Sequence, residues 1–148
     1  MKASKLLREA RQLIEREENW CQGADWKVVM DGPSATRTVT RDDPPDQYCA
    51  LGALEWVADG IPEPHQHTVC ISAMDHLERS AHKLRAQMFP FTLAAGYLSG
   101  PDGTTNTMSL NDGADFHNLQ RKNRARSSHK AILRAYDNAI QQAELEGA

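Results

Sequence analysis

The feature that most constrains this chain is a run of apolar side chains that recurs every three or four residues. Steps of 4, 3, 4, 3 and 4 residues separate Cys70, Met74, Leu77, Ala81, Leu84 and Met88. Such spacing places the side chains on one face of a helix, and it predicts a helix over Thr68 to Met88. The run spans only about two and a half heptads, which is marginal for a free coiled coil. A helix packed in a bundle is therefore favoured over a stripe that faces a partner.

Three further segments have the patterns of helices. The first, Ala3 to Asn19, is amphipathic, with apolar residues at Leu6, Leu7, Ala10, Leu13 and Ile14. The second, Cys49 to Ala58, is apolar on most sides and is expected to be buried. The last, Ser128 to Leu145, has one apolar face, and Ser127 or Ser128 is its expected N-cap.

Other stretches predict strands and loops. In residues 26–40, "WKVVM" and "TRTVT" are typical of short strands joined by the turn "DGPS". Residues 91–98 are moderately apolar, 100–107 are expected to form a loop, and 113–128 an exposed basic connector. We predict one domain over residues 1–148 that is mainly α, or α+β with one minor hairpin. About four helices would pack as a small irregular bundle, with the hairpin after the first helix.

Composition excludes several classes of protein. The net charge of −3 implies no general affinity for nucleic acid. Three cysteines, Cys21, Cys49 and Cys70, lack the spacing of a disulfide framework, which indicates free thiols in a reducing compartment. No apolar run approaches the roughly 20 residues of a membrane span, and the first residues do not resemble a signal peptide. We expect a cytoplasmic protein with no membrane partner.

One candidate site combines Cys49 with His129 and Asn111-Asp112. A thiol at a helix N-terminus can have a depressed pKa, and a cysteine nucleophile also needs a base and a group that orients the base. Cys49 would be the nucleophile, His129 the base, and Asp112 or Asn111 the orienting group. The alternative interpretation is structural, because a free cysteine usually packs as a small apolar residue and Asn-Asp-Gly is ordinary turn chemistry.

A second candidate is a metal site in "EPHQHTVC". His65, His67 and Cys70 are donors suited to zinc, and His76 is a candidate fourth ligand. The alternative is that both loop histidines are simply exposed and that Cys70 faces the interior with the rest of its apolar run.

A third candidate is the basic run "RKNRARSSHKAILR". It contains six cations and no acid: Arg121, Lys122, Arg124, Arg126, Lys130 and Arg134. Such a cluster suits phosphates or an acidic protein surface, although it lacks aromatics for stacking on bases. The alternative is a solvated connector.

Four short blocks in order resemble a known family. They are "NWCQG" from Asn19, "YCALGAL" from Tyr48, "LND" from Leu110 and "HKAILRAYDNAI" from His129. They resemble small proteins of unknown function from bacteria, notably actinobacteria, and their phages, whose patterns are W-x-x-G, W/Y-C-A-x-G-A and W/L-N-D. The chain differs at Leu110, where the family tends to have Trp, and in extra length at 61–108 and a basic insert at 113–128. The resemblance implies a bacterial or phage origin and a shared constellation of Cys49, Asn111, Asp112 and His129, but no activity.

Two functions from different classes follow. The first is a small accessory protein that binds and modulates another protein through a helical face and the basic run. If a phage encodes it, the partner is a host protein. Nucleic acid is the less supported partner. The alternative is a cysteine-dependent hydrolase or transferase built on Cys49, His129 and Asp112 or Asn111. Neither function requires a cofactor. The first is favoured, because the second also requires three residues distant in sequence to meet in one site.

Overall fold

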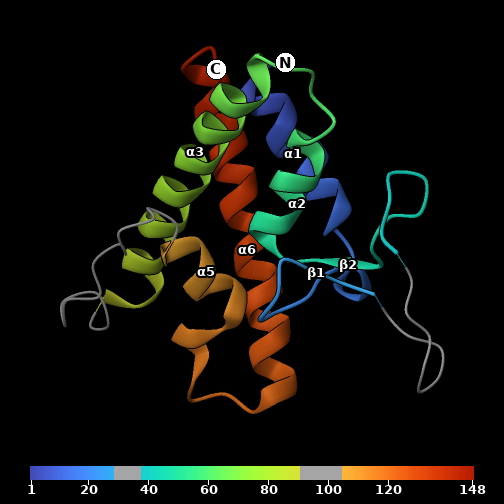
Figure 1. Cartoon of the computed structure of the whole chain (residues 1–148). Helices are drawn as coiled ribbons and strands as arrows, with labels where there is room; N and C mark the ends of the chain where they lie inside the picture. The colour runs from blue at the N-terminus through green and yellow to red at the C-terminus, as the bar shows by residue number, and fades with distance from the viewer. Residues whose placement is uncertain (29–37, 91–104) are drawn as a thin grey trace.

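Five α-helices, two 3₁₀ turns and two short strands occupy the residues that the computed structural model describes, which are 1–28, 38–90 and 105–148. In chain order they are α1 (Ala3–Leu13), η1 (Glu17–Asn19), β1 (Trp26–Lys27), β2 (Gln47–Tyr48), α2 (Ala50–Ala58), α3 (His65–Met88), α5 (Thr105–Asp112), η2 (Ala114–Phe116) and α6 (Arg121–Leu145), as Figure 1 shows. The mainly helical fold with one minor hairpin is confirmed. The described residues hold five helices, however, where about four were predicted. The apolar segment at 91–98 lies outside these residues.

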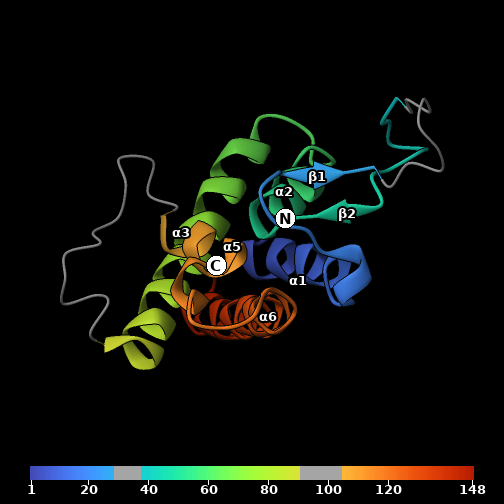
Figure 2. The ribbon, with the colours of Figure 1, turned by 90° about the horizontal axis from the view of Figure 1, so that it is seen from below.

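Helix α6 is the element against which α1, α3 and α5 pack. Figure 2 shows it nearly end-on, with α1 and α3 beside it. Its buried face is made mostly of small side chains at helical spacing: Ala131, Ile132, Ala135, Tyr136, Ala139 and Ala143. Small residues let neighbouring helices approach closely, and the resulting exclusion of apolar surface from water stabilises the bundle.

The apolar run of α3 packs inside the bundle, as its spacing predicts. Leu77, Ala81 and Leu84 are fully buried, and Cys70 and Met74 are half-buried against the same core. Met88, at the end of the helix, is exposed. The bundle interpretation is therefore confirmed for the middle of this run.

Helix α1 ends at Leu13, six residues before the predicted end. The chain then makes the turn η1, and Trp20 enters an isolated parallel bridge with Tyr48. The Cys21 amide continues this contact by donating to the Tyr48 carbonyl over 3.0 Å. The segment after α1 is therefore extended and fixed against β2.

The predicted hairpin is only partly correct. The start of its first predicted strand is observed as β1, which pairs antiparallel with β2 so that Trp26 lies opposite Tyr48. The second predicted strand is wrong as far as it is described, because residues 38–40 have no strand structure and the partner is Gln47–Tyr48. Residues 29–37 lie outside the described part of the chain.

Helix α5 covers residues that were predicted to be loop and turn. The Glu78 carboxylate on α3 caps its N-terminus, since Oε1 accepts from the Asn106 amide at 2.8 Å and Oε2 from the Thr107 amide at 2.9 Å. Amides at a helix start have no partner within the helix, so such a cap stabilises it. The cap comes from a residue 28 positions earlier, and no local pattern around α5 indicates it.

Helix α6 begins at Arg121, seven residues before the predicted start. The N-cap role expected of Ser127 or Ser128 is wrong, because both lie inside the helix, where Ser128 is fully buried. Its hydroxyl donates to the Asn111 carbonyl at 2.8 Å and also to the Leu110 carbonyl. Residues 121–128, expected to be connector, are therefore helical.

Candidate functional site

The side chain of Asn111 is the centre of the candidate site. It is 4% exposed, and its Oδ1 accepts from the Trp20 indole at 2.8 Å and from the Ala50 amide at 3.0 Å. Its Nδ2 donates to the Cys21 carbonyl at 3.2 Å and to Asp112 Oδ1 at 3.0 Å. All four hydrogen-bonding positions of the amide are filled, so Asn111 joins α5 to α2 and to the segment after α1.

Backbone groups beside Asn111 extend this connection. Gln22 Nε2 donates to the Asn111 carbonyl at 2.7 Å, and the Gly23 amide donates to Asp112 Oδ1 at 3.1 Å. Gly23 has a φ of 71°, a left-handed conformation that favours glycine. The sharp turn at Gly23 thus aims its amide at the end of α5.

Cys49 is the N-cap residue of α2. Its Sγ accepts from the Gly52 amide at 3.2 Å, and its own amide donates to the Asp25 carbonyl at 2.8 Å. Burial raises the pKa of the thiol to about 11, which outweighs the lowering by the amides of Gly52 and Leu51. The thiolate expected from the helix N-terminus is therefore disfavoured at neutral pH.

Gly52 is a residue of this site that the sequence did not single out. A Cβ atom at this position would lie 1.8 Å from the Asp25 carbonyl oxygen. The backbone of the segment before β1 therefore passes against the first turn of α2 at a distance that only glycine allows. No local pattern indicates this contact, because the Asp25 carbonyl belongs to a segment 27 residues earlier.

His129 lies two turns into α6 rather than at its start. It is 6% exposed, and its Nε2 lies 2.7 Å from the Ile14 carbonyl. A carbonyl can only accept, so Nε2 carries a hydrogen. The ring also packs on Trp20, with centroids 5.1 Å apart.

The four residues of the predicted constellation are therefore connected, but in a structural way. Asn111 and Asp112 meet the amides of α2 and Gly23, and His129 is linked to them through Trp20. No hydrogen bond among the described residues joins His129 to Cys49. The geometry brings Cys49, Asn111 and Asp112 to one place, whereas His129 contacts Trp20 and the Ile14 carbonyl.

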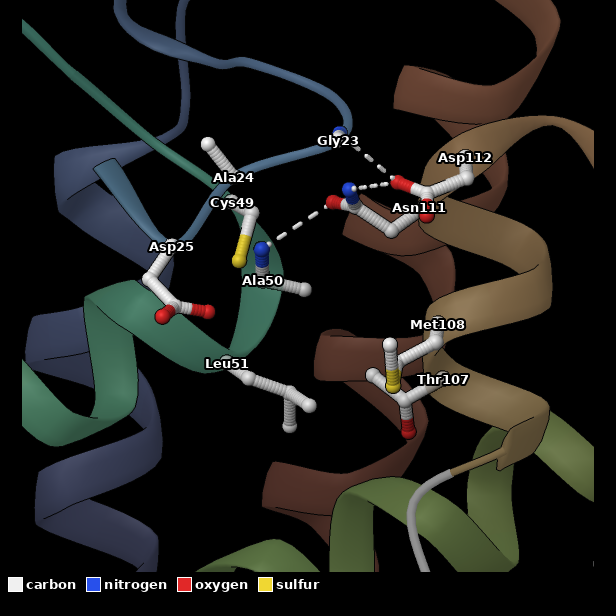
Figure 3. A pocket seen from close by; sticks show the side chains of 10 residues that line it. All are labelled: Gly23, Ala24, Asp25, Cys49, Ala50, Leu51, Thr107, Met108, Asn111 and Asp112. Atoms are coloured by element: carbon white, nitrogen blue, oxygen red, sulfur yellow. Dashed lines mark hydrogen bonds between the residues drawn. The ribbon is translucent and has the colours of Figure 1, made fainter. Parts of the chain in front are cut away.

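A hollow of about 350 Å³ opens where these segments meet. We call it the Cys49 cavity, and Figure 3 shows it between the start of α2 and helix α5. It is lined by residues of three segments that are distant in sequence: Gly23, Ala24, Asp25, Cys49, Ala50, Leu51, Thr107, Met108, Asn111 and Asp112. Its volume is in the range of small-molecule sites.

The predicted metal donors do not converge. His65 and His67 are exposed at the start of α3, and Cys70 is half-buried on the same helix. His76 is buried instead, with Nδ1 3.0 Å from an Arg79 guanidinium nitrogen. Within the described ranges, no three His, Cys, Asp or Glu side chains are grouped so that they could hold a metal ion.

The basic run lies on the N-terminal half of α6. Arg124 is half-buried, and its guanidinium donates to the carbonyls of His117 at 3.3 Å and Leu119 at 3.4 Å. It therefore holds the link between η2 and α6. The other five cations of the run are exposed: Arg121, Lys122, Arg126, Lys130 and Arg134.

A buried ionic network next to the site was not indicated by the sequence. Arg85 on α3 is 2% exposed and makes a bidentate pair with Asp115 in η2, at 2.8 and 3.0 Å. It also donates to Asn106 Oδ1 at 2.6 Å, so α5 is held from both ends. In the sequence, nothing distinguishes Arg85 from the exposed polar residues of the same helix.

None of the helices described is both long enough and apolar enough to cross a lipid bilayer. The fold and the site define a small α-helical protein whose segments are joined at a buried asparagine. A family of unknown function, DUF6197, matches residues 1–142, and the chain belongs to this family. An uncharacterised family was the expectation from the four blocks, and the match covers far more of the chain than those blocks do. Comparison with curated proteins gave no match, and neither did comparison with solved structures.

Proposed function

We propose that this protein is a cytoplasmic accessory protein, of bacterial or phage origin, that binds an acidic surface of another protein through α6. The supporting observation is a line of cations on this helix, Lys122, Arg126, Lys130 and Arg134, which we call the basic ridge. All four are exposed and follow one another every four residues. Such a step advances about 6 Å along the helix and about 40° around it, so the ridge extends over about 18 Å.

The basic ridge makes no ion pair among the described residues, in contrast to five cations on α1 and α3. On α1, Lys5, Arg8 and Arg11 pair with Glu9, Glu144 and Asp137 respectively. On α3, Arg79 pairs with Asp75 and Glu146, and Arg85 with Asp115. None of the ion pairs between described residues includes a member of the ridge. Its charge is therefore available to a partner.

The position of this charge is unfavourable for the helix itself. A helix N-terminus carries a partial positive charge and favours acidic side chains. The first turn of α6 has no acid, and its N-cap residue Gln120 makes no side-chain cap. Arg121 and Lys122 lie in that turn and Arg126 in the next. A helix start that lacks acidic side chains and a side-chain cap breaks a local preference of sequences, and such exceptions are typical of functional surfaces.

An acidic protein is a better partner than nucleic acid. The basic run contains no aromatic side chain on which a base could stack, and the whole chain is acidic, with a net charge of −3. A line of cations on an exposed helix suits a complementary line of carboxylates, which would speed association and select the partner. Rim charges of this kind control the rate of association and its salt dependence more than the affinity.

The alternative of a cysteine enzyme has less support from this site. Burial keeps the Cys49 thiol protonated at neutral pH, whereas a nucleophilic cysteine needs a lowered pKa. The His129 ring is fixed by the Ile14 carbonyl and by Trp20. Both amide groups of Asn111 are occupied by structural hydrogen bonds.

The test compares capture of partner proteins from a bacterial lysate by wild type and by two variants of equal charge. Arg126→Gln/Lys130→Gln/Arg134→Gln removes three of the four charges of the ridge, and Lys5→Gln/Arg16→Gln/Lys83→Gln removes three exposed cations elsewhere. We expect quantitative mass spectrometry to find acidic proteins that wild type and control retain and the ridge variant loses. Equal recovery by both variants would refute the proposal. Duplex DNA titrated at increasing salt is the second arm, and a steep dependence lost only in the ridge variant would point to nucleic acid instead.

A further inference from the structure

The Cys49 cavity, which is separate from the basic ridge, is restricted in the groups that it can bind. The Asn111 amide donates to the Cys21 carbonyl and to Asp112, and the Thr107 hydroxyl donates to Glu78 at 2.8 Å. The amides of Gly23 and Ala50 are also occupied, by Asp112 and Asn111. Apart from the weak S–H donor of Cys49, the side chains that line the cavity therefore offer acceptors to a ligand.

Those acceptors are two carboxylates. Figure 3 shows Asp25 and Asp112 on opposite sides of the cavity. The Asp25 carboxylate has no hydrogen bond or ion pair among the residues described, and of the two Asp112 oxygens only Oδ1 accepts from Gly23 and Asn111. The residues that line the cavity include no Lys, Arg or His. The lining therefore carries two negative charges and no positive charge, and the ammonium of Lys27, on the neighbouring strand β1, donates to the Gln22 carbonyl at 2.6 Å.

A negative potential also acts on the residues of α2 next to the cavity. Glu55, one turn after the cavity, has a raised pKa, caused first by burial and then by the charges of Asp25 and Asp59. The Asp25 carboxylate therefore adds to the negative potential at the start of α2. A cationic ligand would relieve this repulsion.

The remaining lining is apolar. Leu51, on the first turn of α2, and Met108, on α5, face the cavity in Figure 3. Met108 is 45% exposed although it is a large apolar side chain. Flexible methionine side chains adapt to ligands of different shape. Such a lining suits an alkyl chain a few carbons long.

We propose that the Cys49 cavity binds a primary ammonium or a guanidinium group on a short alkyl stem. The charged end is held by Asp25 and Asp112, and the stem lies against Leu51 and Met108. Both groups offer several N–H donors, which match a wall of acceptors. The ligand is either a free alkylamine or the lysine or arginine side chain of a peptide.

The experiment is a titration of the ¹⁵N-labelled full chain, followed by NMR. The probes are n-butylammonium, the neutral n-butanol and the anionic butyrate, which share an alkyl stem and differ in charge. We expect butylammonium to shift the amides of Gly23, Ala50 and Gly52 with millimolar affinity, and the other two probes to leave them unchanged. Equal shifts with butanol or butyrate, or no shift at these amides with butylammonium, would overturn the proposal.

Variants make the test specific to the two carboxylates. Asp25→Asn/Asp112→Asn removes the charges and keeps an oxygen that accepts from Gly23, so we expect roughly tenfold weaker binding or more. Asp25→Asn alone serves if the double variant does not fold. Asp42→Asn is the matched control, because Asp42 is exposed and is not among the lining residues. Unchanged binding by the charge-neutral variants would refute the assignment. Nα-acetyl-lysine amide and Nα-acetyl-arginine amide distinguish the sources, because a peptide side chain as ligand predicts tighter binding of one of them than of butylammonium.

Discussion

Replacing Asn111 with alanine removes the group that joins three segments of the chain. The Trp20 indole and the Ala50 amide would both lose their acceptor, and the Cys21 carbonyl would lose a donor. Asn111 is 4% exposed, so water has little access to these groups. The substitution should therefore destabilise the fold rather than alter one contact.

The magnitude follows from the groups that lose their partners. A buried donor or acceptor left unpaired costs about 1–3 kcal/mol, and alanine leaves two donors and one acceptor in that state. We expect a loss of about 3–6 kcal/mol, a large part of the roughly 5–15 kcal/mol that stabilises a typical domain. Asn111→Asp keeps an acceptor for Trp20 and Ala50 but places a second carboxylate beside Asp112. It should fall between wild type and Asn111→Ala.

The assay is urea unfolding followed by far-UV circular dichroism, with the free energy of unfolding extrapolated to water. Asn138→Ala is the matched control, because Asn138 is exposed on α6 and has no hydrogen bond among the described residues. We expect it to lie within about 0.5 kcal/mol of wild type. If Asn111→Ala lost no more stability than Asn138→Ala, the role assigned to Asn111 would be refuted.

Three further predictions concern the surroundings of this site. Gly52→Ala places a Cβ 1.8 Å from the Asp25 carbonyl oxygen and should cost about 3 kcal/mol or more in urea unfolding. Gly147→Ala, where a Cβ meets nothing within 4 Å, should cost only the strain of its positive φ. Arg85→Ala leaves Asp115 buried without its partner and should cost about 3–5 kcal/mol, while Arg85→Met/Asp115→Leu should recover much of the loss; no recovery would contradict the pairing. The third prediction is that stability falls between about pH 9 and 11, because an unfolded Cys49 loses its proton near pH 9 while the folded thiol, with a pKa of about 11, retains it. Cys49→Ser keeps a cap and should flatten this part of the pH profile by up to about 3 kcal/mol, and identical profiles would contradict the assigned pKa.

Local patterns predict the elements that carry their own apolar periodicity. The run from Cys70 to Met88 indicated α3, and the apolar stretch after Cys49 indicated the buried helix α2. The C-terminal half of α6 was predicted from the spacing of Ile132, Ala135, Tyr136 and Ala139. In each case, the residues that determine the helix lie within the helix itself.

The candidate site could be predicted only as a set of residue types. Cys49, Asn111 and Asp112 do lie together at the Cys49 cavity. The sequence could not indicate their contacts or the raised pKa of Cys49, because the pKa of a thiol depends on burial and the role of an amide depends on its partners. Both are properties of the folded chain. Gly52 and Arg85 had no signal that separated them from ordinary helix residues.

The sequence by itself determined that the chain is mainly helical, that α2 and α3 exist, and that cations gather before the last apolar face. The tertiary structure decided where α5 and α6 begin, which strand pairs with β1, and what Cys49 and His129 contact. The physical reason is distance along the chain. Glu78 caps a helix 28 residues later, Asn111 accepts from Trp20 91 residues earlier, and His129 bonds to Ile14 across 115 residues. Such hydrogen bonds form only after the helices have packed, so no periodicity or local propensity encodes them.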